Sequence, residues 1–145
     1  MLAEKPIHPD FLYYLKDKDQ ALIELFTELR HFVWAQYPEA NELLYHTHAL
    51  TAVFTLSEKL SDGFCHIPIY TEHLNLGFNK GSLLEDSHNL LEGTGKWIRH
   101  IPVRTEADYR RAGVQELIQA AIVLAQDDQV KPAKKQGQSI SKIKR

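Results

Sequence analysis

The chain has 145 residues, of which 43% are hydrophobic and 25% are charged, and its formal net charge is −2 at pH 7. This is the composition of one globular domain, which buries roughly two-thirds of the surface of its unfolded chain. No apolar run approaches the roughly 18 residues that span a bilayer, and the first residues do not resemble a signal peptide. The single cysteine, Cys65, excludes an intrachain disulfide. We therefore expect a cytoplasmic protein without a membrane partner.

The charge is unevenly distributed along the chain. Residues 1–126 contain 11 Lys and Arg against 17 Asp and Glu, a net charge of −6, and residues 127–145 contain 6 against 2, a net charge of +4. An acidic body disfavours nucleic acid as the main partner, because neutralisation of phosphates dominates that affinity. The basic segment has few apolar residues, so we expect residues 127–145 to be a disordered tail that touches nucleic acid only weakly. Residues 1–126 then form a single domain.

The first predicted elements are helical. Residues 8–14 have helical character after Pro6 and Pro9. Residues 19–36 repeat apolar residues at spacings of three and four, which predicts an amphipathic helix. Asp17 or Asp19 supplies its N-cap, and Pro38 ends it.

Between residues 49 and 104 the apolar period changes to two, which predicts β-strands. The strands are expected at residues 49–57, 64–70, 73–79 and 98–104. A tight turn at residues 71–72 places Ile69 opposite Leu74, and a loop at residues 61–63 places Leu56 opposite Cys65. This pairing puts every inward apolar residue on one face, and a slip of one residue would scatter them, so we predict an antiparallel meander.

A second amphipathic helix is predicted at residues 114–125 from the same spacing. One apolar sheet face and two such helices predict an α+β fold, a two-layer sandwich with an N-terminal and a C-terminal helix on a sheet of about four to five strands. The opposite face of the sheet is expected to be solvated or to bind a ligand. It would carry the side chains of Thr51, Thr55, His66, Tyr70, His73, Asn75 and His100.

Four of the seven glycines lie within residues 77–95, and glycines so placed mark backbone that turns sharply or approaches another group closely. The run Gly93-Thr94-Gly95-Lys96 fails the Walker A pattern, because Leu90 and Trp97 stand where glycine and Ser or Thr are needed. This run either shapes a loop before the last strand or forms a nest of N–H groups that binds an anion beside Lys96. The candidate ligand-binding residues are Gly93, Gly95, Lys96, Arg99 and His100. Arg99 has a structural alternative, a pairing with a carboxylate such as Glu92.

The helix at residues 19–36 carries a candidate metal site. Glu24, Glu28 and His31 fall within about 60° of one another on its exposed face, and such ligands suit iron or manganese. A solvated helix face produces the same pattern.

Catalytic motifs are absent from the sequence: it contains no HExxH, no Cys/His cluster at zinc spacing and no nucleophile elbow. Cys65 and His66 are neighbours on a strand and point to opposite faces, so Cys65 is expected to be an inert core thiol. We therefore predict a non-enzymatic protein without a cofactor, unless ferrous ion binds Glu24, Glu28 and His31.

The order of these features resembles the YdhG-like family of domains of unknown function. The resemblance covers about residues 8–126 and rests on the opening helix that ends near Tyr37-Pro38-Glu39, the meander, Leu76-Gly77-Phe78-x-x-Gly81 and Leu91-Glu92-Gly93-Thr94-Gly95-Lys96-x-x-Arg99-His100-Ile101. It implies a small α+β protein with helices on an antiparallel sheet. Some members are described as frataxin-like intracellular iron chaperones, which implies weak binding of ferrous ion on an acidic surface. Here Glu24, Glu28 and His31 are the matching residues.

These observations predict a protein that binds a small ligand or a protein partner through the glycine-rich loop and the outer sheet face. The alternative is an iron chaperone that uses the helix face. A third possibility, an enzyme acting on an anionic metabolite, requires Lys96, Arg99 and His100 to converge on one pocket.

Overall fold

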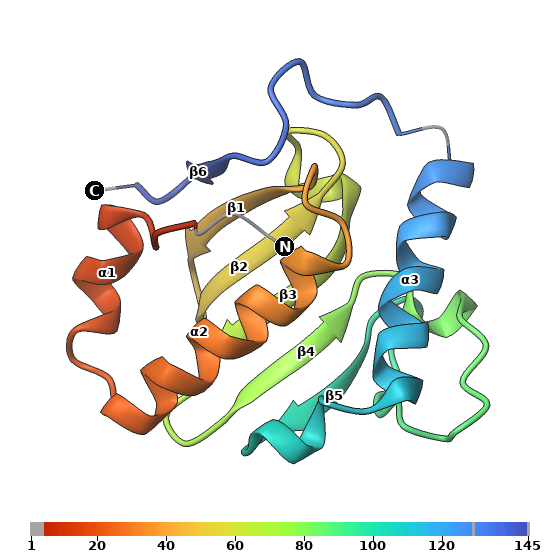
Figure 1. Cartoon of the computed structure of the whole chain (residues 1–145), viewed down its shortest axis with the longest axis horizontal. Coiled ribbons are helices and arrows are strands. Elements are labelled where there is room, and N and C mark those ends of the chain that lie inside the picture. The colour runs from red at the N-terminus through yellow and green to blue at the C-terminus, as the bar shows by residue number, and fades with distance from the viewer. Residues whose placement is uncertain (1–4, 129, 145) are drawn as a thin grey trace.

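The computed structural model describes residues 5–128 and 130–144. In this part of the chain, the helices α1 Pro9–Leu15, α2 Gln20–Ala35 and α3 Ala112–Asp127 pack on one six-stranded sheet. The strands are β1 Asn41–His46, β2 Leu50–Thr55, β3 Gly63–Ile69, β4 Leu74–Phe78, β5 Arg99–Val103 and β6 Ser139–Ser141. Figure 1 shows α2 and α3 lying across the same face of the sheet. The predicted α+β fold is confirmed, with six strands rather than four to five.

The strands follow the order β5-β4-β3-β2-β1-β6, in which β1 to β5 form an antiparallel meander. Ile69 faces Leu74, as predicted. An irregularity between Phe54 and Thr55 interrupts the β2–β3 register. Cys65 faces Phe54 rather than Leu56, because β2 ends at Thr55 and a longer connection, which contains the 3-10 helix η1 Leu60–Asp62, leads to β3. The difference is two residues, so the side chains keep their parity and the apolar set stays on the face that the helices cover.

Local signals fix where the helices begin. The Asp19 carboxylate caps α2 by accepting a hydrogen bond from the N–H of Ala21 at 2.8 Å. Pro9 occupies the first position of α1, where its fixed φ suits the helix. Among the described residues, no helix is long and apolar enough to cross a membrane.

The core lies between the helices and the inner face of the sheet. Burial of each large apolar side chain contributes about 1.5–3 kcal/mol, so this layer supplies most of the stability. The largest fully buried side chains include Trp34, Tyr109, Phe11, Phe26, Phe54 and Phe78.

The strand β1 lacks a predictive pattern because each of its faces buries a polar residue beside an apolar one. Its first four residues are all buried, among them Glu42. The Glu42 carboxylate pairs with the buried guanidinium of Arg30, with Nε of Arg30 2.6 Å from Oε2 of Glu42. Arg30 also donates hydrogen bonds to the backbone carbonyls of Lys5 and Pro6. A strand that buries a charged pair shows no alternation of apolar and polar residues.

The prediction of a disordered tail at residues 127–145 is corrected by β6, which pairs in parallel with β1 and places Ile140 opposite Leu43. The hydroxyl of Ser139 donates a hydrogen bond to Oε1 of Glu42 at 2.8 Å, and the N–H of Gln138 donates to Oδ1 of Asn41 at 2.8 Å. Figure 1 shows this segment crossing from the end of α3 to the opposite edge of the sheet. The domain therefore extends past residue 126.

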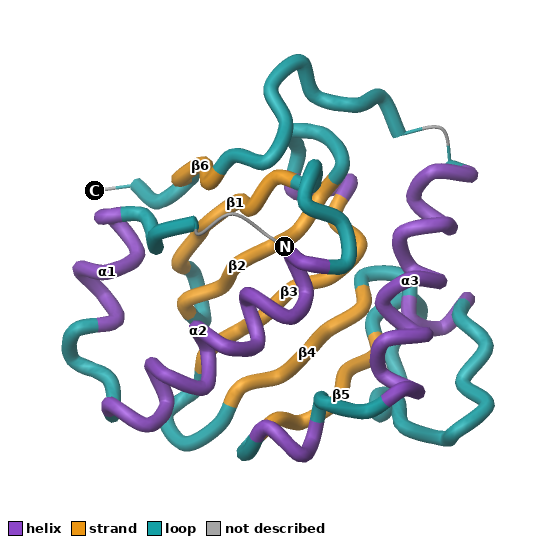
Figure 2. The backbone as a smooth tube through the Cα atoms, in the orientation of Figure 1, coloured by secondary structure: helices purple, strands orange, loops and turns teal. Residues whose placement is uncertain are grey.

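The connection between β4 and β5 contains the glycine-rich loop and the short 3-10 helix η2 Gly81–Leu83. Figure 2 shows most of this connection as loop, running beside α3. His88 contacts α3, since its Nε2 lies 3.4 Å from Oε2 of Glu116.

Candidate functional site

The sheet face opposite the helices carries a hollow of about 380 Å3, which we call the outer-face hollow. This volume lies within the range of about 300–1,000 Å3 that is usual for small-molecule sites. The lining includes five residues that the strand parity predicts for this face: Thr51, His66, Tyr70, Asn75 and His100. The remaining lining residues are Tyr45, Thr47, His48, Ala49, Pro68 and Ile98. Several of these belong to β1 and the turn after it, where the sequence gives no strand signal.

The outer-face hollow has a distinct chemistry. None of the described residues that line it is Asp, Glu, Lys or Arg. Its polar groups are imidazoles, hydroxyls and an amide, and its aromatic rings offer flat apolar faces. An ion in such a site would lose hydration without gaining a carboxylate, ammonium or guanidinium partner. The lining therefore suits an uncharged polar ligand.

His66 presents a neutral imidazole on this face. Its Nδ1 lies 2.9 Å from Oδ1 of Asn79, and because an amide oxygen accepts, Nδ1 carries the proton and Nε2 is left as an acceptor. Burial lowers the pKa of His66; the hydrogen bond with Asn79 raises it in part, and the neighbouring His100 lowers it again. The ring is thus uncharged at neutral pH.

Gly77 makes room for that imidazole. The two residues face each other in the β3–β4 pairing, and a Cβ atom at position 77 would lie only 2.1 Å from Nε2 of His66. This glycine, part of the motif in the sequence, therefore serves a close approach between side chain and backbone.

Asn75 holds an acceptor without a partner. Its Oδ1 is buried, and no described group of the protein donates a hydrogen bond to it. An unpaired buried acceptor costs about 1–3 kcal/mol. A ligand that donates to the Asn75 amide would recover part of that free energy.

The side chain of Arg99 forms hydrogen bonds with the backbone of the glycine-rich loop. Its Nη1 donates to the backbone carbonyl of Gly95 at 2.6 Å and to that of Ile98 at 2.8 Å. The expected pairing with Glu92 is wrong, because no ion pair of the described residues includes Arg99. Glu92 instead exchanges backbone hydrogen bonds of 2.8 and 2.9 Å with His100.

The other predicted loop residues lie outside the outer-face hollow. Gly93 has a φ of 127°, which only glycine adopts readily, and Gly95 and Lys96 are exposed. The Lys96 ammonium lies 5.3 Å from the ring centroid of Trp97. Of the five predicted ligand-binding residues only His100 lines the hollow, so the convergence required for an enzyme acting on an anion is not met there.

The predicted metal ligands are not assembled into a site. Within the described part of the chain, no group of three or more His, Cys, Asp or Glu is arranged to hold a metal ion. Glu28 pairs instead with Arg110, with Oε2 and Nη2 3.1 Å apart. Glu24 lies 3.5 Å from the side-chain amide of Gln20. The expectation of a site at Glu24, Glu28 and His31 is corrected to a solvated helix surface.

Comparison with protein-family models, with curated proteins and with solved structures finds no match to this chain. The resemblance to the YdhG-like family stays a prediction. The fold is that of a small α+β domain, and its described strands form one sheet.

Proposed function

We propose that this protein binds a small, uncharged, planar ligand that carries N–H donors, a compound of about the size of a nucleobase, in the outer-face hollow. The observation that carries the proposal is the lining, which combines aromatic and hydrogen-bonding side chains and has no Asp, Glu, Lys or Arg among its described residues. Such a lining is sufficient for a domain that binds a ligand without transforming it.

Each part of the lining has a role in the proposal. In this proposal the Asn75 side chain turns to bring its buried oxygen to the ligand, and this oxygen and Nε2 of His66 accept hydrogen bonds from it. Tyr70 offers a ring for stacking and is itself held by His73, with ring centroids 5.0 Å apart. A planar ligand therefore finds both a flat contact and directional partners.

The test is a calorimetric titration of the full chain with benzamide and with benzoate. The two probes share one ring, but only benzamide is neutral and donates N–H groups. We expect saturable binding of benzamide and none of benzoate. Equal binding of the two, binding of benzoate alone, or no binding of benzamide would contradict the proposal.

A variant pair locates the binding. Asn75→Ala removes the amide and should weaken benzamide binding by about threefold to tenfold, the value of one hydrogen bond. Glu24→Gln, on the exposed surface of α2, is the control and should bind benzamide as the parent chain does. Equal losses in both variants would place the site elsewhere.

A further inference from the structure

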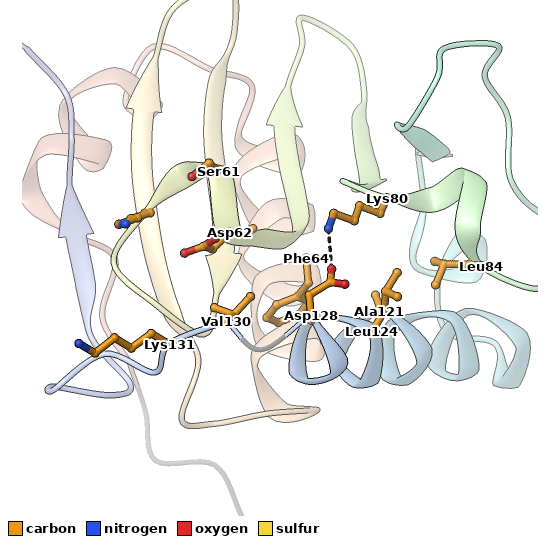
Figure 3. A pocket seen from close by; sticks show the side chains of 13 residues that line it. Ser61, Asp62, Phe64, Lys80, Leu84, Ala121, Leu124, Asp128, Val130 and Lys131 are labelled. Carbon is orange, nitrogen blue, oxygen red and sulfur yellow. Dashed lines mark hydrogen bonds and ion pairs between the residues drawn. The ribbon is translucent and has the colours of Figure 1, made fainter.

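A second cavity, of about 350 Å3, lies between the C-terminal half of α3 and the segments that flank β3 and β4 (Figure 3). We call it the lysine-rimmed pocket. It shares no lining residue with the outer-face hollow. Its apolar walls are formed by Phe64, Leu84, Ala121, Leu124, Ala125 and Val130.

Small side chains keep this pocket open. Ala121 and Ala125 are four residues apart in α3 and so lie on the same face of the helix. Both belong to the apolar stripe of α3, yet neither reaches far enough to fill the space between the helix and Leu84. A larger residue at either position would occupy the pocket.

Charged groups surround the apolar walls. Nζ of Lys80 lies 2.5 Å from Oδ2 of Asp128, and Figure 3 shows this pair joining the two sides of the pocket. Lys59 and Lys131 also line it, and among the described residues neither ammonium has an ion-pair partner. The remaining acid, Asp62, accepts a hydrogen bond from the hydroxyl of Ser57 at 2.7 Å. The rim thus carries three lysines against two carboxylates.

We propose that the lysine-rimmed pocket binds a monocarboxylate with a medium-length alkyl chain. The chain lies along the apolar walls, and the ligand carboxylate replaces Asp128 as the partner of Lys80. An alkyl carbon takes about the volume of a water molecule in the liquid, ~30 Å3, so a ligand of about eight carbons fills most of the cavity. A carboxylate fits better than a phosphate ester, because one carboxylate takes the place of another at a single lysine.

The experiment is a calorimetric titration of the full chain with octanoate, hexanoate, octyl phosphate and octyltrimethylammonium, below their micelle concentrations. Each methylene contributes about fourfold in affinity, so hexanoate should bind about fifteenfold more weakly than octanoate. The cationic probe should not bind. Affinity that is independent of chain length, or tighter binding of octyl phosphate than of octanoate, would overturn the proposal.

Two variants with opposite expected effects on octanoate affinity then test whether the ligand replaces Asp128 at Lys80. Lys80→Gln should weaken octanoate binding by about fivefold, as befits a partly exposed ion pair, and Asp128→Asn should strengthen it by releasing Lys80. Lys96→Gln, an exposed lysine outside the pocket, is the matched control. Ala125→Leu should block octanoate binding by filling the pocket. If that variant fails to fold, Lys80→Gln and Asp128→Asn still test the proposal. Equal affinities in Lys80→Gln and Lys96→Gln would overturn the proposal.

The lysine-rimmed pocket and the outer-face hollow should bind their ligands independently. Asn75→Ala should leave octanoate binding unchanged, and Lys80→Gln should leave benzamide binding unchanged. Loss of octanoate binding in Asn75→Ala would place octanoate in the outer-face hollow and overturn the assignment.

Discussion

The Nδ1 atom of His66 lies 2.9 Å from Oδ1 of Asn79. This contact fixes the tautomer of the imidazole and leaves Nε2 as an acceptor on the outer sheet face. The ring packs against the backbone of Gly77, which has no side chain to displace it. The outer-face hollow is therefore lined by a neutral, oriented acceptor and by Asn75, whose amide oxygen has no partner among the described residues.

We expect Gly77→Ala to damage both the fold and the hollow. The added methyl group would overlap Nε2 of His66, and overpacking of this kind costs about 1–3 kcal/mol. Urea unfolding should show this loss, and calorimetry should show weaker binding of benzamide. Gly95→Ala is the control, because no atom lies within 4 Å of a Cβ there. Equal stability of the two variants would refute the steric role of Gly77.

The pH dependence of stability should carry the signature of His66. Burial lowers the pKa of His66 in the folded chain below its ordinary value near 6.5, so the unfolded chain binds a proton at higher pH than the folded chain does. The stability that neutral His66 contributes is present above pH 6.5 and is lost as the pH falls from there toward the lowered pKa. His66→Gln should flatten the free energy of unfolding between pH 7.5 and 5.5, measured by urea denaturation. The exposed His31→Gln serves as the control, and a curve for His66→Gln parallel to that of the parent chain would contradict the assignment.

The Arg30–Glu42 pair should be among the costliest contacts to break. Its side chains are 5% and 1% exposed, and the loss of one partner leaves an uncompensated buried charge, at about 3–5 kcal/mol. Glu42→Ala should lose that much free energy of unfolding in urea. Glu24→Ala, on the exposed face of α2, should lose less than about 0.5 kcal/mol. Similar losses of unfolding free energy in the two variants would contradict a large contribution of the buried pair to stability.

Cys65 should be chemically silent in the folded protein. It is fully buried in the core, and burial raises the pKa of its thiol, so the reactive thiolate is scarce. Iodoacetamide at pH 8.5 should label the chain in urea and leave it unlabelled in buffer, as mass spectrometry can measure. Rapid labelling of the folded chain would contradict a core position.

The sequence predicts most of the fold because β2 to β5 keep their inward-facing residues apolar, which leaves an apolar period of two even though β2 is buried on both faces. It does not predict β1, where Glu42 is buried on a strand against Arg30, or β6, which has three residues and lies in a lysine-rich segment. The irregularity after Phe54 also leaves no trace in the apolar pattern. Contacts between distant segments decide all three features, and a local pattern does not contain them.

The sequence likewise predicts one part of the candidate site and not another. Strand parity places His66 and Asn75 on the outer face, and both line the hollow. The composition of the glycine-rich loop predicted a ligand site, but the guanidinium of Arg99 donates its hydrogen bonds to carbonyls of the loop itself. That use depends on the path of the backbone between Gly95 and Arg99, which residue types alone do not specify.

The most direct test of the central claim is a long-range 1H–15N spectrum of the histidine side chains, recorded while benzamide is added to the full chain. Binding in the outer-face hollow should shift the Nε2 resonance of His66 and the resonances of His100, and should leave those of His31 and His88 in place. Unshifted His66 and His100 resonances at saturating benzamide, or shifts confined to His31 and His88, would contradict the account.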